Sequence, residues 1–296
     1  MLSPPLSLLS DDLLNYIVDH VAKLRRSNLY LQYLSITDRA FTRFCQAHLF
    51  KDLYLGYESG TNKSISKKLA KIRNILNDEP SFAHRVRAVH LTFAENRNRW
   101  LFNDPTFITV MQLLAKSPIP PHKLHLTSFW PSHHPFIIED PIFIVGWLMQ
   151  SFFSQTLTVL DLIECKNVPL TLFLVCPNLK EVYLDDVEVF DSRDDEYTQC
   201  SARELPSPEH LSYIKSGSLV KQMITPPPKF SMPVVDFSKL RVLKLCPQEK
   251  KDMVCLQPIL DAACDTLEEL YLTNLQATWD LAGKMGISIN VAHLQV

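Results

Sequence analysis

The sequence predicts an α/β protein in which a short N-terminal segment of three helices precedes an irregular leucine-rich-repeat solenoid with parallel strands on its concave face. Three observations support this prediction. Apolar residues recur at helical spacing over residues 9–53, an apolar frame repeats from residue 86 onward, and helix-like stretches separate its copies. We therefore expect a helical segment at 1–55, a linker helix at 56–85 and a repeat domain at 86–296.

The N-terminal helices are predicted from caps and periodicity. Ser10 is a suitable helix cap, and the acidic Asp11 and Asp12 lie in the first turn, where the helix dipole favours negative charge. Apolar residues then recur at helical spacing on one stripe. The first helix carries Leu9, Leu13, Leu14, Ile17, Val18 and Val21, and the following ones carry Leu29, Leu31, Leu34, Ile36, Phe41 and Phe44.

The repeating frame consists of apolar residues at positions one, four and six. Its six copies are Val86-x-x-Val89-x-Leu91, Leu124-x-Leu126, Leu157-x-x-Leu160-x-Leu162, Leu179-x-x-Val182-x-Leu184, Leu240-x-x-Leu243-x-Leu245 and Leu267-x-x-Leu270-x-Leu272. Alternate side chains of a strand point to opposite faces, so the leucines point inward and their neighbours outward. A strand followed by a helical return, repeated, is the leucine-rich-repeat arrangement.

Two details qualify this pattern. Leu211-x-x-Ile214 is a weak seventh copy. Cys165 and Asn167 follow the best frame, Leu157-x-x-Leu160-x-Leu162, at the position where such repeats turn and use an inward cysteine or asparagine to satisfy the strand-end backbone groups. Residues 188–238 are rich in acidic residues and proline, and we expect an exposed, partly disordered insertion there.

The outward positions of the strands are the candidate recognition surface. Tyrosine and histidine present rigid contact area at low entropic cost, which suits a protein-binding face. The same side chains can also serve only to keep the sheet face soluble. The candidates for client binding are His90, His125, Asp161, Tyr183, Asp185, Lys244 and Tyr271.

Composition limits the classes of partner that we expect. With 30 Lys plus Arg against 32 Asp plus Glu, the net charge of -2 creates no field that would attract nucleic acid or a membrane surface. Only six glycines accompany 20 prolines, and no glycine-rich phosphate loop occurs. We therefore expect neither a nucleic-acid nor a membrane partner, and no cofactor.

Cysteine usage indicates the compartment. The seven cysteines are odd in number and include no CxxC pair, and the proline-broken N-terminus lacks the basic start of a signal peptide. These features predict a reducing compartment, cytoplasmic or nuclear or both.

Sequence motifs that would indicate metal binding or catalysis are weak. The histidines at 122, 125, 133 and 134 could ligate a metal, but a binding-face or solvated role is the simpler interpretation, and we predict no metal site. The basic series from Lys63 to Arg73 fits the solvated face of an amphipathic helix. No nucleophile stands beside an acid-base pair in any recognisable spacing, so we expect no catalytic residue and no enzymatic activity.

The N-terminal segment resembles the F-box proteins, most closely the fungal F-box-like type. Residues 9–20 correspond to the opening helix of that family, 31–41 to its leucine-rich segment ending in an aromatic residue, and 48–55 to its exit into the first strand. Further on, 66–80 followed by 86–91 is similar to the linker helix and first repeat strand. The sequence departs from the family at Ser10, at Asp12 and at the pair Thr37-Asp38, where proline, glutamate and Val-Cys are usual.

The resemblance implies a substrate-recognition adaptor of an SCF-type cullin-RING ubiquitin ligase. Its N-terminal helices would bind a Skp-family adaptor and its repeat domain an unidentified client protein. The implied adaptor-binding residues are Leu9, Leu13, Leu14, Ile17, Val18, Leu34, Ile36 and Phe41. Two alternatives stay open: a repeat scaffold without a ligase link, whose helices only cap the solenoid, and an enzyme or small-molecule receptor with a pocket on the inner face.

Overall fold

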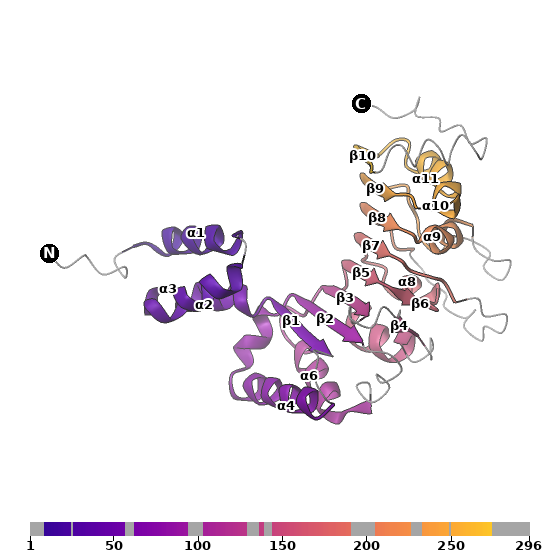
Figure 1. Cartoon of the computed structure of the whole chain (residues 1–296). Helices are drawn as coiled ribbons and strands as arrows, with labels where there is room; N and C mark the ends of the chain where they lie inside the picture. Colours follow the sequence, from indigo (N-terminus) through magenta and orange to yellow (C-terminus); the bar gives the residue numbers. More distant parts are fainter. Residues whose placement is uncertain are drawn as a thin grey trace.

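The computed structural model describes residues 9–24, 26–56, 62–93, 103–128, 136–138, 144–190, 205–225, 233–248 and 250–273. It is an α/β protein with an N-terminal helical segment and an eight-stranded parallel sheet (Figure 1), so the fold class is confirmed at that level. Within the described ranges, no helix is long and apolar enough to cross a membrane.

The N-terminal segment has a small core of its own. Its helices are α1 (Asp11–Ala22), α2 (Ser27–Thr37) and α3 (Arg39–Leu49). The hydroxyl of Ser10 accepts a hydrogen bond from the backbone N–H of Leu13 (3.4 Å), and the carboxylate of Asp38 caps α3 through the N–H of Ala40 (2.8 Å). The buried core consists of Leu14, Val18, Leu31, Phe41 and Cys45.

The main sheet runs in the order β1-β2-β3-β5-β7-β8-β9-β10, so its strands follow one another in chain order. The strands are β1 (Asp52–Gly56), β2 (Ala88–Phe93), β3 (Lys123–Ser128), β5 (Val159–Ile163), β7 (Glu181–Asp185), β8 (His210–Ile214), β9 (Val242–Cys246) and β10 (Glu269–Leu272). A separate two-stranded ladder joins β4 (Phe136–Ile137) to β6 (Cys165–Lys166).

Helices connect the parallel strands. They are α4 (Asn62–Asp78), the 3₁₀ helix η2 (Pro80–Arg85), α6 (Pro105–Ala115), the π-helix η4 (Ile144–Phe153), α8 (Thr171–Leu174), α9 (Gly217–Ile224), α10 (Lys250–Val254) and α11 (Leu256–Ala262). Figure 1 shows these helices along one side of the strand row, outside its bend. The other side of the sheet carries no helix in the described part of the chain, and we call it the open face.

The register confirms the alternation that the frame predicts. Leu91, Leu126, Leu162 and Leu184 are paired across β2, β3, β5 and β7 and are buried on the helix side. The thiol of Cys165, which is also buried, bonds to the carbonyl oxygens of Leu126 (3.6 Å) and Ile163 (3.4 Å). Cys165 therefore points into the core after the best frame.

The predicted exposed insertion at 188–238 is wrong for residues 205–225 and 233–238. Residues 205–225 form β8 and α9, and their apolar side chains belong to the main core. Val234, Val235 and Phe237 are buried in the same core. Leu211 pairs with Leu243 and Tyr213 with Leu245, so the frame here is Leu211-x-Tyr213 and not Leu211-x-x-Ile214. The tyrosine replaces a leucine because its hydroxyl finds a buried acceptor, the backbone oxygen of Asp252 at 3.1 Å. Residues 191–204 and 226–232 lie outside the described residues.

The sheet also begins earlier than predicted. β1 pairs in parallel with β2, with Leu53 opposite Val89, so a strand assigned to the helical segment belongs to the main sheet. The helix expected as a linker, α4, buries Ile65 and Leu69 in the same main core. The boundary between the two cores therefore falls between α3 and β1.

Candidate functional site

The open face brings nearly all predicted client-binding residues into one row. Six of the seven occupy the middle row of the sheet, and Asp185 lies one row further along, paired with Ile163 and Ile214. Tyr54 and Ser212 belong to the middle row but were missed. β1 was assigned to the helical segment, and β8 was predicted only as a weak copy of the frame within an expected insertion. From β1 to β10 this middle row reads Tyr54, His90, His125, Asp161, Tyr183, Ser212, Lys244 and Tyr271.

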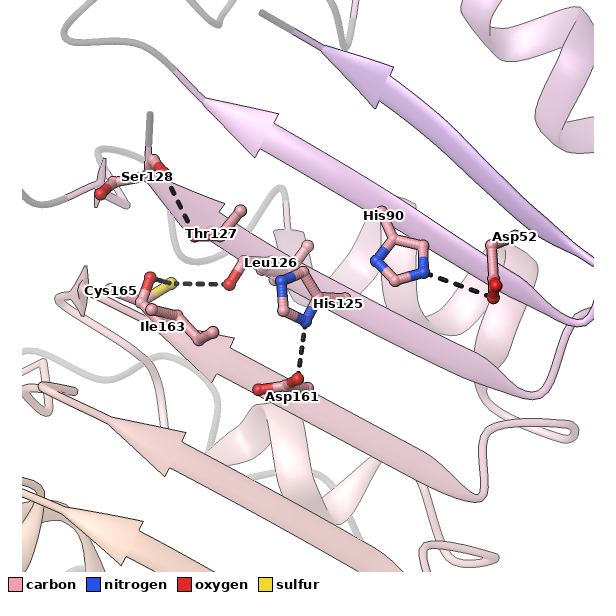
Figure 2. A network of polar contacts seen from close by, with 9 residues as sticks. All are labelled: Asp52, His90, His125, Leu126, Thr127, Ser128, Asp161, Ile163 and Cys165. Atoms are coloured by element: carbon pink, nitrogen blue, oxygen red, sulfur yellow. Dashed lines mark hydrogen bonds and ion pairs between the residues drawn. The ribbon is translucent and has the colours of Figure 1, made fainter. Parts of the chain in front are cut away.

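Aromatic rings stack along the first strands of the middle row. The ring of Tyr54 stacks on His90 with centroids 4.3 Å apart, and the His90 ring lies 5.0 Å from that of His125. Nδ1 of His125 lies 2.7 Å from Oδ2 of Asp161, and Nε2 of His90 lies 3.5 Å from Oδ1 of Asp52 (Figure 2). The bond to His90, assisted by its charge, holds the pKa of Asp52 below its usual value. Ring contacts and contacts with carboxylates thus fix these side chains on the open face.

The tyrosines of the later strands are fixed by carboxylates. The hydroxyl of Tyr183 donates to Oε2 of Glu181 (2.9 Å), and the Tyr183 ring lies 5.0 Å from that of His210. Burial, together with this bond, raises the pKa of Tyr183 to about 12. Tyr271 likewise donates to Glu269 (2.7 Å), and Nζ of Lys244 lies 5.0 Å from the centre of the Tyr271 ring.

Carboxylates gather where β5 and β7 end. Glu164 and Asp186 follow these strands with φ angles of 52° and 53°, in the left-handed region that short polar turns use. Ser128 donates a hydrogen bond to Glu164. Burial raises the pKa of Asp185, and the nearby negative charges of Asp186, Glu164 and Asp161 add to the rise while Lys215 opposes it. This end of the open face is therefore negative.

Two histidines make the stability of the fold depend on pH. Burial lowers the pKa of His122 and His210 in the folded state, and nearby cationic side chains, Lys123 and Lys244 respectively, contribute. The unfolded chain therefore binds protons at higher pH than the folded one, and this part of the stability is lost as pH falls below about 6.5. We expect a smaller fall in unfolding free energy between pH 7.5 and 5.5 for His210→Gln than for the intact chain, measured by urea denaturation. An equal or larger fall would contradict this assignment.

The structure divides the predicted adaptor-binding residues into three groups. Leu14, Val18 and Phe41 are buried in the helical core and contribute no surface, which corrects their assignment. They were selected because apolar periodicity marks a buried stripe as readily as a binding stripe. Partly buried residues packed against the same core are Leu9, Ile17 and Leu34. Only Leu13, 52% exposed, and Ile36, 80% exposed, project into solvent.

The exposed apolar surface of the helical segment was partly missed. On α2, Leu29, Tyr33 and Ile36 are spaced four and three residues apart, so they lie on one face of the helix. Tyr33 is 57% exposed. The further large exposed residues on these helices are Tyr16 and Tyr30. The sequence could have indicated this exposed surface, because apolar residues occupy more than one face of α2.

In the described residues, neither the histidine cluster nor the basic series of α4 forms a recognisable binding site. Within the described ranges, no group of three or more His, Cys, Asp or Glu side chains is placed to hold a metal ion. His125 is engaged by Asp161, and His133 and His134 lie outside the described residues. On α4, the exposed Lys67 and Lys71 lie away from the buried apolar face, as an amphipathic helix requires.

A hollow of about 720 Å³ lies at the edge where β8, β9 and β10 begin, not on the open face. Two of its charged lining residues pair with each other. The guanidinium of Arg241 makes two bonds, of 2.9 and 2.8 Å, to the carboxylate of Glu268. The lining residues are Glu209, Lys239, Arg241, Cys264, Asp265, Thr266, Leu267 and Glu268. Nothing here resembles an apolar ligand pocket.

Comparison with known proteins returns no match to a family model, to a curated protein or to a solved structure. The function is therefore inferred from the two surfaces of this chain, the exposed apolar face of α1 and α2 and the open face of the sheet.

Proposed function

We propose that this protein is a substrate-recognition adaptor of an SCF-type cullin-RING ubiquitin ligase. The N-terminal helices bind a Skp-family adaptor, and the open face of a leucine-rich-repeat solenoid holds a client protein. The observation that carries the proposal is the set of large apolar side chains exposed on α1 and α2, next to a core that is already complete.

The exposed side chains on α2 are not used to cap the sheet. The helical core and the main core are separate clusters. The contacts described across their junction include residues of α3 and those just after it. Gln46 accepts a bond from Arg85 (2.7 Å), the ring of Phe50 lies 4.7 Å from that of Phe82, and the backbone oxygen of Lys51 accepts the N–H of Arg87 (2.8 Å). Exposed apolar patches next to a satisfied core are typical of protein-binding surfaces.

The repeat part of the proposal is supported by three features. Strands follow one another in chain order in a parallel sheet. Five of the six predicted apolar frames are buried, and the sixth, in β10, is partly buried. The thiol of Cys165 points inward to the backbone carbonyls of Leu126 and Ile163. Such a domain would act by holding the client near the ligase, which raises its effective concentration without chemistry by this chain.

The alternative is a leucine-rich-repeat interaction scaffold with no ligase link. It is favoured by two of the positions where the sequence departs from the F-box pattern, Ser10 and Asp38. Both side chains cap helices of the segment, so their identity is explained by helix stability alone.

The proposal is tested with Tyr33→Asp/Ile36→Asp in a pulldown of a purified Skp-family adaptor. Both positions are exposed, so we expect the double variant to fold, as far-UV circular dichroism would show. Two charges placed in an apolar interface should weaken capture by about tenfold or more.

Ile75→Asp/Ile119→Asp is the matched control, because both isoleucines are exposed and lie outside the helical segment. It should capture the adaptor as the intact chain does. No capture by the intact chain, or equal capture by the α2 variant, would overturn the proposal in favour of the scaffold.

A further inference from the structure

We propose that the open face receives an extended client segment through an arginine side chain, which binds among Asp161, Tyr183 and Asp185. This inference deepens the proposed function and rests on it for the source of the segment. Neither the chemistry of the site nor its test requires a ligase.

The three residues are neighbours on the sheet. Asp161 on β5 is paired directly with Tyr183 on β7, and Asp185 lies two residues beyond Tyr183 on the same face. Adjacent strands lie about 5 Å apart, and residues two apart on a strand are separated by about 7 Å. One guanidinium can therefore lie against the ring and reach the carboxylate of Asp185 and Oδ1 of Asp161. The other carboxylate oxygen of Asp161, Oδ2, is bonded to Nδ1 of His125 (2.7 Å).

Charge complementarity selects a cation. Five described carboxylates lie around Tyr183. Among the nearby lysines, Lys166 lies 3.1 Å from Glu188 and Lys180 lies 3.3 Å from Glu209, and the charge of Lys215 near Asp185 leaves the carboxylates in excess. The carboxylates are Asp161, Glu164, Glu181, Asp185 and Asp186. The raised pKa of Asp185 is consistent with this excess of negative charge. A nucleic acid or an acidic peptide would be repelled.

The aromatic neighbour favours arginine over lysine. A guanidinium is planar, stacks on an aromatic ring and donates two parallel bonds to a carboxylate, whereas an ammonium is a strongly hydrated point charge. The hydroxyl of Tyr183 is held by Glu181, so the ring is fixed before binding. Lys123 and Lys244 stand in other strands of the open face and disfavour a long run of basic residues. The geometry thus fits one arginine in a largely uncharged segment.

The test uses fluorescein-labelled peptide pools of about ten residues, long enough to cross the central strands. Each pool is randomised over uncharged residues around a fixed central Arg, Lys, Gln or Glu, and binding is followed by fluorescence anisotropy. We expect the Arg pool to bind about tenfold more tightly than the Gln pool, with Lys between them and Glu weakest. Equal binding of the Gln or Glu pool would overturn the inference.

Asp161→Asn/Asp185→Asn should lower affinity for the Arg pool by about tenfold and leave the Gln pool unchanged. Asp78→Asn/Glu79→Gln is the control, because it removes two charges from exposed positions at the end of α4, away from the open face. If the control loses as much affinity as the first variant, general electrostatics and not this site explains binding.

The outcome is separable from that of the ligase proposal. Tyr33→Asp/Ile36→Asp should bind the Arg pool as the intact chain does, whether or not either protein captures the adaptor. Arginine binding without adaptor capture would support this site and refute the ligase link. Adaptor capture without preference for the Arg pool would do the reverse.

Discussion

Replacing Asp252 by alanine is expected to lower the free energy of unfolding by about 3 kcal/mol. The side chain is 0% exposed, and its two carboxylate oxygens accept the backbone N–H groups of Gly217 (3.0 Å) and Gln248 (2.9 Å). Gly217 begins α9, so the carboxylate also interacts favourably with the positive end of that helix. Alanine leaves the buried N–H of Gly217 without its acceptor.

Urea denaturation followed by far-UV circular dichroism measures this effect. Asp261→Ala is the matched control, since Asp261 is exposed and accepts a hydrogen bond from the side chain of Gln257 on the same helix (2.7 Å). Its expected change is within about 0.5 kcal/mol. Equal losses for the two variants would show that the Asp252 carboxylate does not hold the start of α9 to the turn before α10.

Gly56→Ala is expected to destabilise the edge of the sheet by about 2 to 4 kcal/mol. Gly56 ends β1 with a φ of 121°, which L-residues rarely adopt, and an added Cβ would lie 2.1 Å from the carbonyl oxygen of its partner Thr92. Neither the strain nor the clash can be relieved without shifting the backbone. Because β1 is an edge strand, the loss should appear first as faster hydrogen exchange of the β1 and β2 amides.

The same substitution at Gly146 is the control. Gly146 lies within η4, and an added Cβ would meet nothing within 4 Å. Gly146→Ala should leave stability unchanged or raise it by up to about 1 kcal/mol. If the β1 and β2 amides exchange at the same rate in the Gly56→Ala and Gly146→Ala variants, the pairing of β1 with β2 does not require the positive φ of Gly56.

Strands with a clear alternating pattern could be predicted from the sequence, and others could not. In β5, Leu160 and Leu162 alternate with outward residues, and this period of two is visible within a few residues. β8 was predicted only as a weak seventh copy with the wrong frame, because proline-rich flanks suggested a loop and Tyr213 occupies a leucine position. Its tyrosine is explained only by the buried acceptor on α10, 39 residues away.

The candidate surfaces show the same division. Periodicity found the apolar residues of α1 and α2 but could not distinguish Val18, which is fully buried, from Ile36, which is 80% exposed. That difference is set by how α1, α2 and α3 pack together. On the sheet, outward positions were found strand by strand, but that Asp161 stands beside Tyr183 follows from the register between β5 and β7.

The sequence by itself determined the α/β class, the helical start and the outward position of most open-face residues, because these depend on spacings within one helix or strand. Only the tertiary structure decided where the sheet begins, which apolar side chains of the helical segment stay exposed, and which outward residues form one row. These features depend on pairing and packing between residues far apart in the chain, and no local pattern encodes them.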